Sequence, residues 1–187
     1  MGRSRGMRFA AVVVLVAGLS LGVAGDGSGV AADRASAFGD RVLARAESWY
    51  RVNLEYSQER CYHTGSGYRA IDWSGPLGGC RQPFHRTDCS GFVSMTWGLE
   101  FSYATPRPGD SPDLADVAHP IQLSQLRAGD ILVADGKHVR LFERWLDYAA
   151  GRYRAYDFGA TPVKHQDYVW RAPGEHDYRP MRDNRHP

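Results

Sequence analysis

The stretch Ser124–Trp145, SQLRAGDILVADGKHVRLFERW, carries the clearest secondary-structure signal in the chain. Its apolar run Ile131–Val133 is followed by Asp135-Gly136, a dipeptide that favours a tight hairpin turn. After the turn, residues 138–144 have the composition and alternation of a second strand. The stretch therefore predicts two antiparallel strands joined by a short turn.

Segments on both sides of this hairpin extend the pattern. Residues 152–158 and 167–172 have strand character, whereas apolar residues recur at three- and four-residue steps from about 32 to 50, as in an amphipathic helix. A second helix is predicted from 89 to about 99, and residues 51–87 between the helices are rich in turn formers. Two helices followed by a run of strands indicate an α+β fold with an antiparallel sheet.

The chain of 187 residues suits one domain with short extensions. At its start, Arg3, Arg5 and Arg8 precede an apolar run of about 15 residues, followed by small residues. A membrane span needs roughly 20 apolar residues, so we favour a cleaved signal peptide over residues 1–32 rather than an uncleaved anchor. Residues 33–187 would then form a single secreted, extracellular domain.

Charge and motif spacing exclude several classes of partner. Cleavage after Ala32 would remove three of the 23 basic and one of the 21 acidic residues, which leaves a formally neutral mature chain. No basic patch stands out, so we expect no nucleic-acid partner. The chain has no Cys-x-x-Cys or His-Glu-x-x-His spacing, so we expect no metal and no cofactor.

Three cysteines in an exported chain imply one disulfide and one free thiol, because the compartment is oxidising. Cys61 and Cys80 bracket a turn-rich segment, and a bridge between them would close a loop of about 20 residues and stabilise the fold by roughly 3 kcal/mol. This pairing leaves Cys89 free. On spacing alone, a bridge from Cys89 to Cys61 or to Cys80 stays an alternative.

Cys89 lies at the predicted start of a helix, in the stretch RTDCSGFVSMTW. Unpaired N–H groups and the helix dipole favour the thiolate there, and the thiolate is the nucleophilic form. The same N–H groups can stabilise an oxyanion on a carbonyl that the sulfur attacks. The position suits acyl-transfer chemistry, although buried structural cysteines also occur at such places.

A cysteine nucleophile needs a nearby base, which a third polar group orients. Of the seven histidines, His138 opens a strand directly after a tight turn, and it shares a face of that strand with Arg140 and Phe142. If the strand at 152–158 pairs with it, Asp157 could hold the imidazole. The alternatives are an exposed histidine at a hairpin end and a surface aspartate.

Taken together, TDCSGFV and LRAGDILVADGKHVRLF resemble the NlpC/P60 superfamily of cell-wall peptidases, which are papain-like enzymes with a Cys-His-polar triad. Three features match in order: Asp-Cys-Ser-Gly at a helix start, Gly129-Asp130 before a strand, and His-Val at the start of the next strand. The resemblance covers roughly residues 35–172. It implies a papain-like fold in which helices pack on an antiparallel β-sheet and the nucleophile lies at a helix N-terminus.

The resemblance assigns the catalytic roles. Cys89 matches the nucleophile, His138 the base, and Asp157 falls where the third member is expected on the following strand. The connection ERWLDYAAGR before that strand is longer than is typical of the family. The position of Asp157 is therefore an expectation to within a residue or two.

The resemblance also points to substrate-binding residues. Asp88 and Ser90 match positions that receive the free amine of the stem peptide, and a carboxylate is a sensible partner for an ammonium. Tyr56 matches a substrate-side tyrosine, but the proline that precedes it in the family is absent from LEYSQ. Asp130 is expected to fix its turn rather than to contact substrate.

The implied function is a secreted, cell-wall-associated cysteine peptidase, acting as a monomer, that hydrolyses peptide bonds in peptidoglycan stem peptides. The γ-D-glutamyl–diaminopimelate bond is one that the family often cuts. The alternatives are an N-acetylmuramyl-L-alanine amidase or an acyltransferase on the same scaffold, or a non-catalytic wall-binding module.

Overall fold

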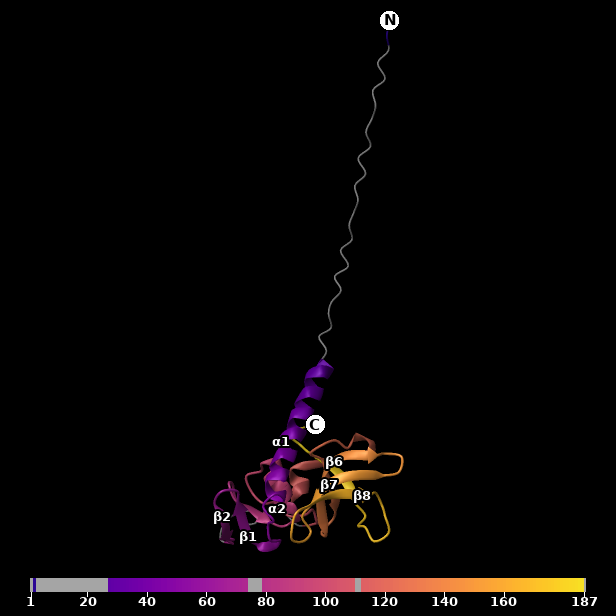
Figure 1. The fold of residues 1–187 in the computed structure, drawn as a ribbon. Helices are drawn as coiled ribbons and strands as arrows, with labels where there is room; N and C mark the ends of the chain where they lie inside the picture. The colour runs from indigo at the N-terminus through magenta and orange to yellow at the C-terminus, as the bar shows by residue number, and fades with distance from the viewer. Residues whose placement is uncertain (1, 3–26, 74–78, 110–111, 187) are drawn as a thin grey trace.

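The computed structural model describes residues 2, 27–73, 79–109 and 112–186. Within these residues the fold is α+β, with two α-helices, two short 3-10 helices (η1 and η2) and two antiparallel sheets (Figure 1). The elements in chain order are α1 (Gly27–Tyr50), β1 (Ser57–His63), β2 (Gly67–Ala70), β3 (His85–Thr87), α2 (Cys89–Trp97), η1 (Leu114–Asp116), β4 (Ala118–Pro120), η2 (Leu123–Gln125), β5 (Ile131–Ala134), β6 (His138–Asp147), β7 (Arg152–Asp157), β8 (Lys164–Val169) and β9 (Arg179–Asp183). The predicted α+β class with an antiparallel sheet is confirmed.

Helix α1 is the predicted amphipathic helix, and it begins five residues before the expected start. It buries one stripe against the sheet, from Phe38 through Val42 and Ala46 to Trp49, as the three- and four-residue spacing predicts. Residues 27–32 of the predicted signal peptide form its first turns, and nearly all of the remaining signal peptide lies outside the described residues. No helix in the described part of the chain is long and apolar enough to cross a membrane.

Helix α2 confirms the predicted start at Cys89. Asp88 is its N-cap, and one carboxylate oxygen of Asp88 accepts a hydrogen bond from the N–H of Gly91. Gly91 is required because a Cβ there would lie 2.1 Å from the carbonyl oxygen of Arg86. Gly98, with a φ of 67°, ends the helix in a left-handed conformation, so the helix stops earlier than predicted.

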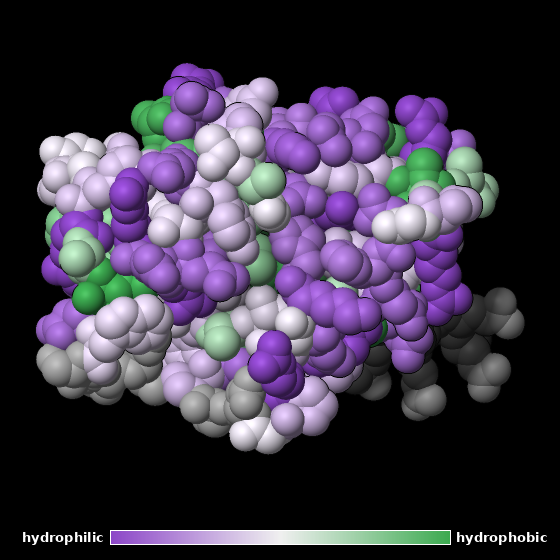
Figure 2. Space-filling model, turned by 90° about the horizontal axis from the view of Figure 1, so that it is seen from below, coloured by the Kyte–Doolittle hydropathy of each residue, from purple (hydrophilic) through white to green (hydrophobic). Residues whose placement is uncertain are grey.

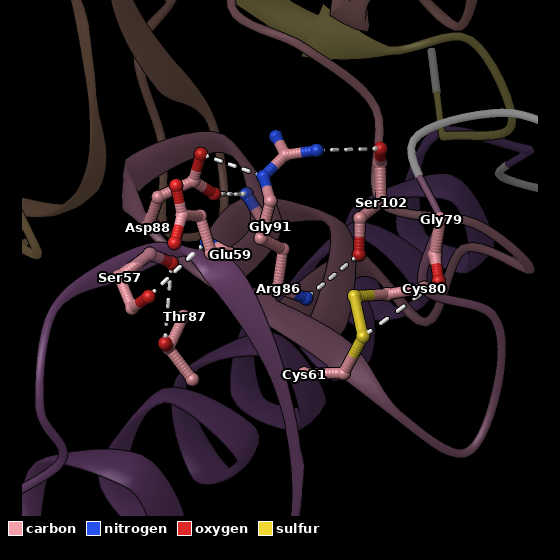
Figure 3. The surroundings of a disulfide bond; sticks show 10 residues. All are labelled: Ser57, Glu59, Cys61, Gly79, Cys80, Arg86, Thr87, Asp88, Gly91 and Ser102. Atoms are coloured by element: carbon pink, nitrogen blue, oxygen red, sulfur yellow. Dashed lines mark hydrogen bonds and ion pairs between the residues drawn. A yellow bond between two sulfur atoms is a disulfide. The ribbon is translucent and has the colours of Figure 1, made fainter. Parts of the chain in front are cut away.

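The segment 51–87, predicted as loops, contains three of the strands. They form a sheet in the order β2-β1-β3. Strand β1 has exposed or half-buried side chains everywhere except at Cys61, so it lacks the alternation that would have predicted it. Cys61 forms the predicted disulfide with Cys80 (Figure 3). Cys89 is free.

The larger sheet has the order β4-β9-β5-β6-β7-β8. The predicted hairpin is confirmed: Ala134 pairs with His138, and Gly136 in the turn has a φ of 65°. Strand β8 begins at Lys164, earlier than the expected 167. Its first residues are polar, so the sequence pattern did not predict them as part of the strand. Strands β4 and β9 were not predicted. Figure 1 shows β6, β7 and β8 side by side, with α1 and α2 packed near them.

Strand β9 is a central strand although it contains Pro180, which cannot donate a ladder hydrogen bond. The carbonyl oxygen of Pro180 accepts a hydrogen bond from the N–H of Ile121, one residue beyond the end of β4. The hydrogen bond that Pro180 cannot donate would therefore fall at the end of the β4–β9 ladder. Met181 in the same strand is buried, and Arg182 forms an ion pair with buried Asp130. Long-range burial and pairing thus place a polar C-terminal segment inside the sheet.

The sheet is packed on both faces. Val139 and Leu141 of β6 belong to the hydrophobic cluster that includes α1 and α2. Phe142 belongs to a second cluster on the opposite face, with Tyr153 and other side chains of β5, β7 and β8. The predicted division of β6 into two faces is confirmed, because Val139 and Leu141 lie on one side of the sheet and Phe142 lies on the other.

The outer surface is mainly polar where Figure 2 displays it: hydrophilic residues cover most of this face, and hydrophobic residues occur in small separate groups. Some large hydrophobic side chains are nevertheless exposed among the described residues. The most exposed of them is Trp73, at 68%. Trp73 also lines the cavity described next.

Candidate active site

The three residues predicted to be catalytic come from three elements and meet in one place. Cys89 is the first residue of α2, His138 the first of β6 and Asp157 the last of β7. The imidazole Nε2 of His138 lies 2.9 Å from Oδ1 of Asp157. Cys89 lies close enough to His138 to raise the pKa of the imidazole. Because Nε2 faces Asp157, Nδ1 is the ring nitrogen left for the sulfur.

The strand register explains how His138 reaches Asp157. Arg140 pairs directly with Asp157 across β6 and β7, and His138 lies two residues before Arg140 on the same face, so it is a diagonal neighbour of the carboxylate. Gly159, just past β7, leaves room for the ring. A Cβ there would lie 2.9 Å from Cε1 of His138, and its own N–H donates to Oδ1 of Asp157 at 2.9 Å.

A buried network holds the carboxylate of Asp157 on its other side. Its Oδ2 accepts from Nε of Arg140 at 2.6 Å and from the hydroxyl of Tyr168 at 3.1 Å. The guanidinium of Arg140 also donates to Glu175 at 2.7 Å and to the hydroxyl of Tyr153 at 3.1 Å. It lies 3.7 Å from the ring centre of Tyr168.

Sequence reasoning found only part of this network. Arg140 was placed on the face of His138 but received no role. Tyr168 lies in a segment predicted as a strand, without a functional signal. Glu175 lies outside every helix and strand of the fold, and nothing in its local sequence distinguishes it from other surface acids.

The network fixes the charges of the pair. Burial alone would lower the pKa of His138, but hydrogen bonds to Asp157 and Cys89 and the charges of both raise it to about 9. Burial would raise the pKa of Asp157, but His138 and Arg140 hold it well below its usual range. His138 is therefore an imidazolium and Asp157 a carboxylate at neutral pH in the folded protein.

Cys89 lies at the wall of a cavity of about 300 Å³. The residue is 5% exposed, and its Sγ lies 3.6 Å from Oγ1 of Thr105. The N–H groups of the first turn of α2 have no partner inside the helix, so this end carries partial positive charge. The cavity is lined by Gln58, Trp73, Arg86, Asp88, Cys89, Ser90, Ala104, Thr105, Arg107, Gly136 and Lys137.

Tyr56 lies next to this site, as expected. Its backbone N–H donates to Oγ1 of Thr161 at 2.7 Å, and its ring packs edge-on against Phe158, which directly follows Asp157. Burial and the nearby Cys89 and Asp88 raise the pKa of Tyr56. The structure thus places the phenol of Tyr56 between the strand end that carries Asp157 and the start of α2.

Asp88 and Ser90 line the cavity, but both are bound by a residue that sequence reasoning missed. Nε of Arg86 donates to Oδ2 of Asp88 at 2.7 Å, and Nη2 of Arg86 donates to Oγ of Ser90 at 2.9 Å. Figure 3 shows the guanidinium of Arg86 against the carboxylate of Asp88. The only sequence signal for this pair is an arginine two residues before an acid.

Asp130 is structural, as expected: its Oδ2 accepts from the N–H of Arg127 at 2.8 Å and from Arg182 at 2.9 Å. Among the described residues, no group of three or more His, Cys, Asp or Glu side chains is arranged to hold a metal ion. No protein-family model matches the chain, and no curated protein or solved structure matches it significantly. The chemistry is therefore argued from the site itself.

Proposed function

We propose that this chain is a secreted cysteine peptidase with a papain-like NlpC/P60 fold, which hydrolyses peptide bonds in the stem peptides of peptidoglycan. The observation that carries the proposal is the position of His138, which is hydrogen-bonded to Asp157 and close enough to Cys89 for Cys89 to raise its pKa. A thiol, an imidazole and an orienting carboxylate in this order are the parts of a cysteine nucleophile's catalytic machinery.

The proposed chemistry follows from the arrangement of the three groups. The thiolate of Cys89 attacks the peptide carbonyl, and N–H groups of the first turn of α2 stabilise the oxyanion. The imidazolium of His138 gives its proton to the leaving amine, which departs and leaves a thioester on Cys89. Neutral His138 then takes a proton from water, which hydrolyses the thioester and restores the starting charges.

Asp157 acts through His138 and does not transfer a proton. Its carboxylate stays ionised because His138 and Arg140 hold its pKa low. It fixes Nε2 of the imidazole, so Nδ1 keeps facing the sulfur. The same role explains why Gly159 lacks a side chain, since a Cβ there would push the ring away from this geometry.

The direct test is digestion of purified peptidoglycan fragments by the mature protein. We expect wild type to release peptides, and Cys89→Ala to release none while keeping its circular-dichroism spectrum. His138→Gln should also be inactive, whereas His63→Gln should cleave like wild type, because the ring of His63 contacts Ser66 away from the site. Cleavage that survives in Cys89→Ala would remove the mechanism.

Product masses identify the reaction. A peptidase leaves stem peptides cut between two amino acids. An N-acetylmuramyl-L-alanine amidase would instead release intact stems from the sugar, and an acyltransferase would join two peptides. A wall-binding module would bind the fragments and yield no product from any variant.

A further inference from the structure

Asp88, the acid expected to bind a substrate amine, already has a hydrogen-bond partner on each carboxylate oxygen. Both oxygens of Asp88 accept short hydrogen bonds, Oδ1 from the N–H of Gly91 at 2.8 Å and Oδ2 from Arg86 at 2.7 Å. The side chains of Asp88 and Arg86 are only 6% and 10% exposed. Arg86 is fixed in turn by Ser90 and by the carbonyl oxygens of Ser102 and Tyr103. The two charges form a buried, immobile pair.

This pairing leaves little attraction for an ammonium. Among the described residues that line the cavity, Asp88 is the one acidic side chain. An ammonium beside it would also lie beside the guanidinium of Arg86, and the repulsion between the two cations offsets the attraction of the carboxylate. A free amino end therefore finds no unpaired acid among the described residues of this cavity.

Among the described residues that line the cavity, the remaining charged side chains are basic. Lys137 directly precedes His138 in the turn between β5 and β6, and it is exposed at the cavity. Arg107 also lines the cavity, and its guanidinium donates to the carbonyl of Gly136 in the same turn at 3.4 Å. Because the charges of Arg86 and Asp88 cancel, the exposed Lys137 brings to the cavity a positive charge that a substrate carboxylate can approach.

We propose that the cavity beside Cys89 binds a carboxylate of the substrate near Lys137 and takes peptides whose amino end is acylated and uncharged. The inference rests on the proposed function, whose substrate class it narrows. For peptidoglycan, it selects stem peptides that are still amide-linked to the glycan and carry an unamidated carboxylate beside the scissile bond. Trp73, exposed at the same cavity, would offer the attached sugar a flat apolar face.

Calorimetric binding to Cys89→Ala tests this proposal without depending on catalysis. The probes are four stem tripeptides, with a free or N-acetylated amine and with the glutamyl carboxylate free or amidated. We expect the free carboxylate to bind about fivefold more tightly than the amide, the effect of one solvent-accessible ion pair. N-acetylation should leave binding unchanged or tighter.

Charge reversal assigns the preference to a residue. Adding Lys137→Glu to the Cys89→Ala protein should abolish the preference for the carboxylate, and Lys137→Gln should reduce it. Arg34→Glu is the matched control, because Arg34 is an exposed base on α1 that does not line the cavity. It should leave all four affinities unchanged.

The inference is overturned if the free amine binds tenfold more tightly than its acetylated twin, if Lys137→Glu keeps the preference for the carboxylate, or if none of the four peptides binds. Wild-type hydrolysis of the same peptides separates the two proposals. Binding with the expected preferences but without cleavage would sink the peptidase proposal and leave the binding inference standing. Cleavage without these preferences would overturn the binding inference and leave the peptidase proposal standing.

Discussion

The contact between His138 and Asp157 should make folding stability fall between pH 7 and pH 9. The pKa of His138 is raised from 6.5 to about 9 in the folded protein. A raised pKa means that the folded state binds the proton more tightly, so the stabilisation is complete below 6.5 and is lost as the pH rises through about 9. The side chain of His138 is 11% exposed, so solvent screens the effect little.

The size of the effect follows from the two pKa values. A histidine with a pKa of 6.5 unfolded and about 9 folded stabilises the protein by about 2.5 kcal/mol at pH 7 and by about 0.4 kcal/mol at pH 9. Wild type should therefore lose about 2 kcal/mol of unfolding free energy over this range. Other shifted groups titrate outside it: the lowered pKa of His85 acts below 6.5, and the raised pKa of Tyr168 acts above 10.

The assay is urea unfolding, followed by tryptophan fluorescence at pH 7, 8 and 9. Asp157→Asn keeps the shape of the side chain but removes the charge, so its stability should change little over this range. Asp167→Asn is the matched control. Asp167 pairs with Arg154 at 2.7 Å on the adjacent strand and its side chain is 40% exposed, so that variant should keep the wild-type slope.

Cys89 also raises the pKa of His138, so the series is repeated in Cys89→Ala. A smaller loss of stability between pH 7 and pH 9 should remain there, because Asp157 is still present. The reasoning is refuted if Asp157→Asn loses as much stability as wild type over this range.

Two further predictions concern positions that support the site. Gly159→Ala should lower peptidase activity about 100-fold with an unchanged circular-dichroism spectrum, because its Cβ would lie 2.9 Å from Cε1 of His138 and displace the ring; wild-type kcat would contradict this. Cys61→Ser combined with Cys80→Ser should lower the free energy of urea unfolding by about 3 kcal/mol, because the 19-residue loop opens in the unfolded state. A loss under about 0.5 kcal/mol, the size of a neutral surface change, would show that the bridge does not constrain that state.

The parts of the fold that were predicted correctly are those in which local sequence and burial agree. Ile131 is fully buried, and its strand ends in a turn whose Gly136 adopts the left-handed conformation that glycine favours. On the buried stripe of α1, Val42 lies four residues from both Phe38 and Ala46, and Trp49 lies three residues from Ala46. Because each signal spans a few residues, it is visible without knowledge of the rest of the chain.

The missed strands depend on partners far away in the sequence. Strand β1 buries Cys61 alone, and its other side chains carry no alternation. In β9, Arg182 is buried because it pairs with Asp130, which lies 52 residues earlier. Polar side chains predict a surface position unless the compensating charge is known, and a single sequence does not show which acid will meet which arginine.

The same limit explains which part of the site was predicted. Helix and strand starts placed Cys89 and His138, and strand pairing placed Asp157, but the charge balance of the site depends on Glu175. The guanidinium of Arg140 pairs with two carboxylates, Asp157 and Glu175. A buried charge is tolerated when it is paired, and Glu175 gives Arg140 a second anion beside the carboxylate that it shares with His138. The acid that completes the pairing of Arg140 thus lies 18 residues beyond Asp157, in a segment without regular structure.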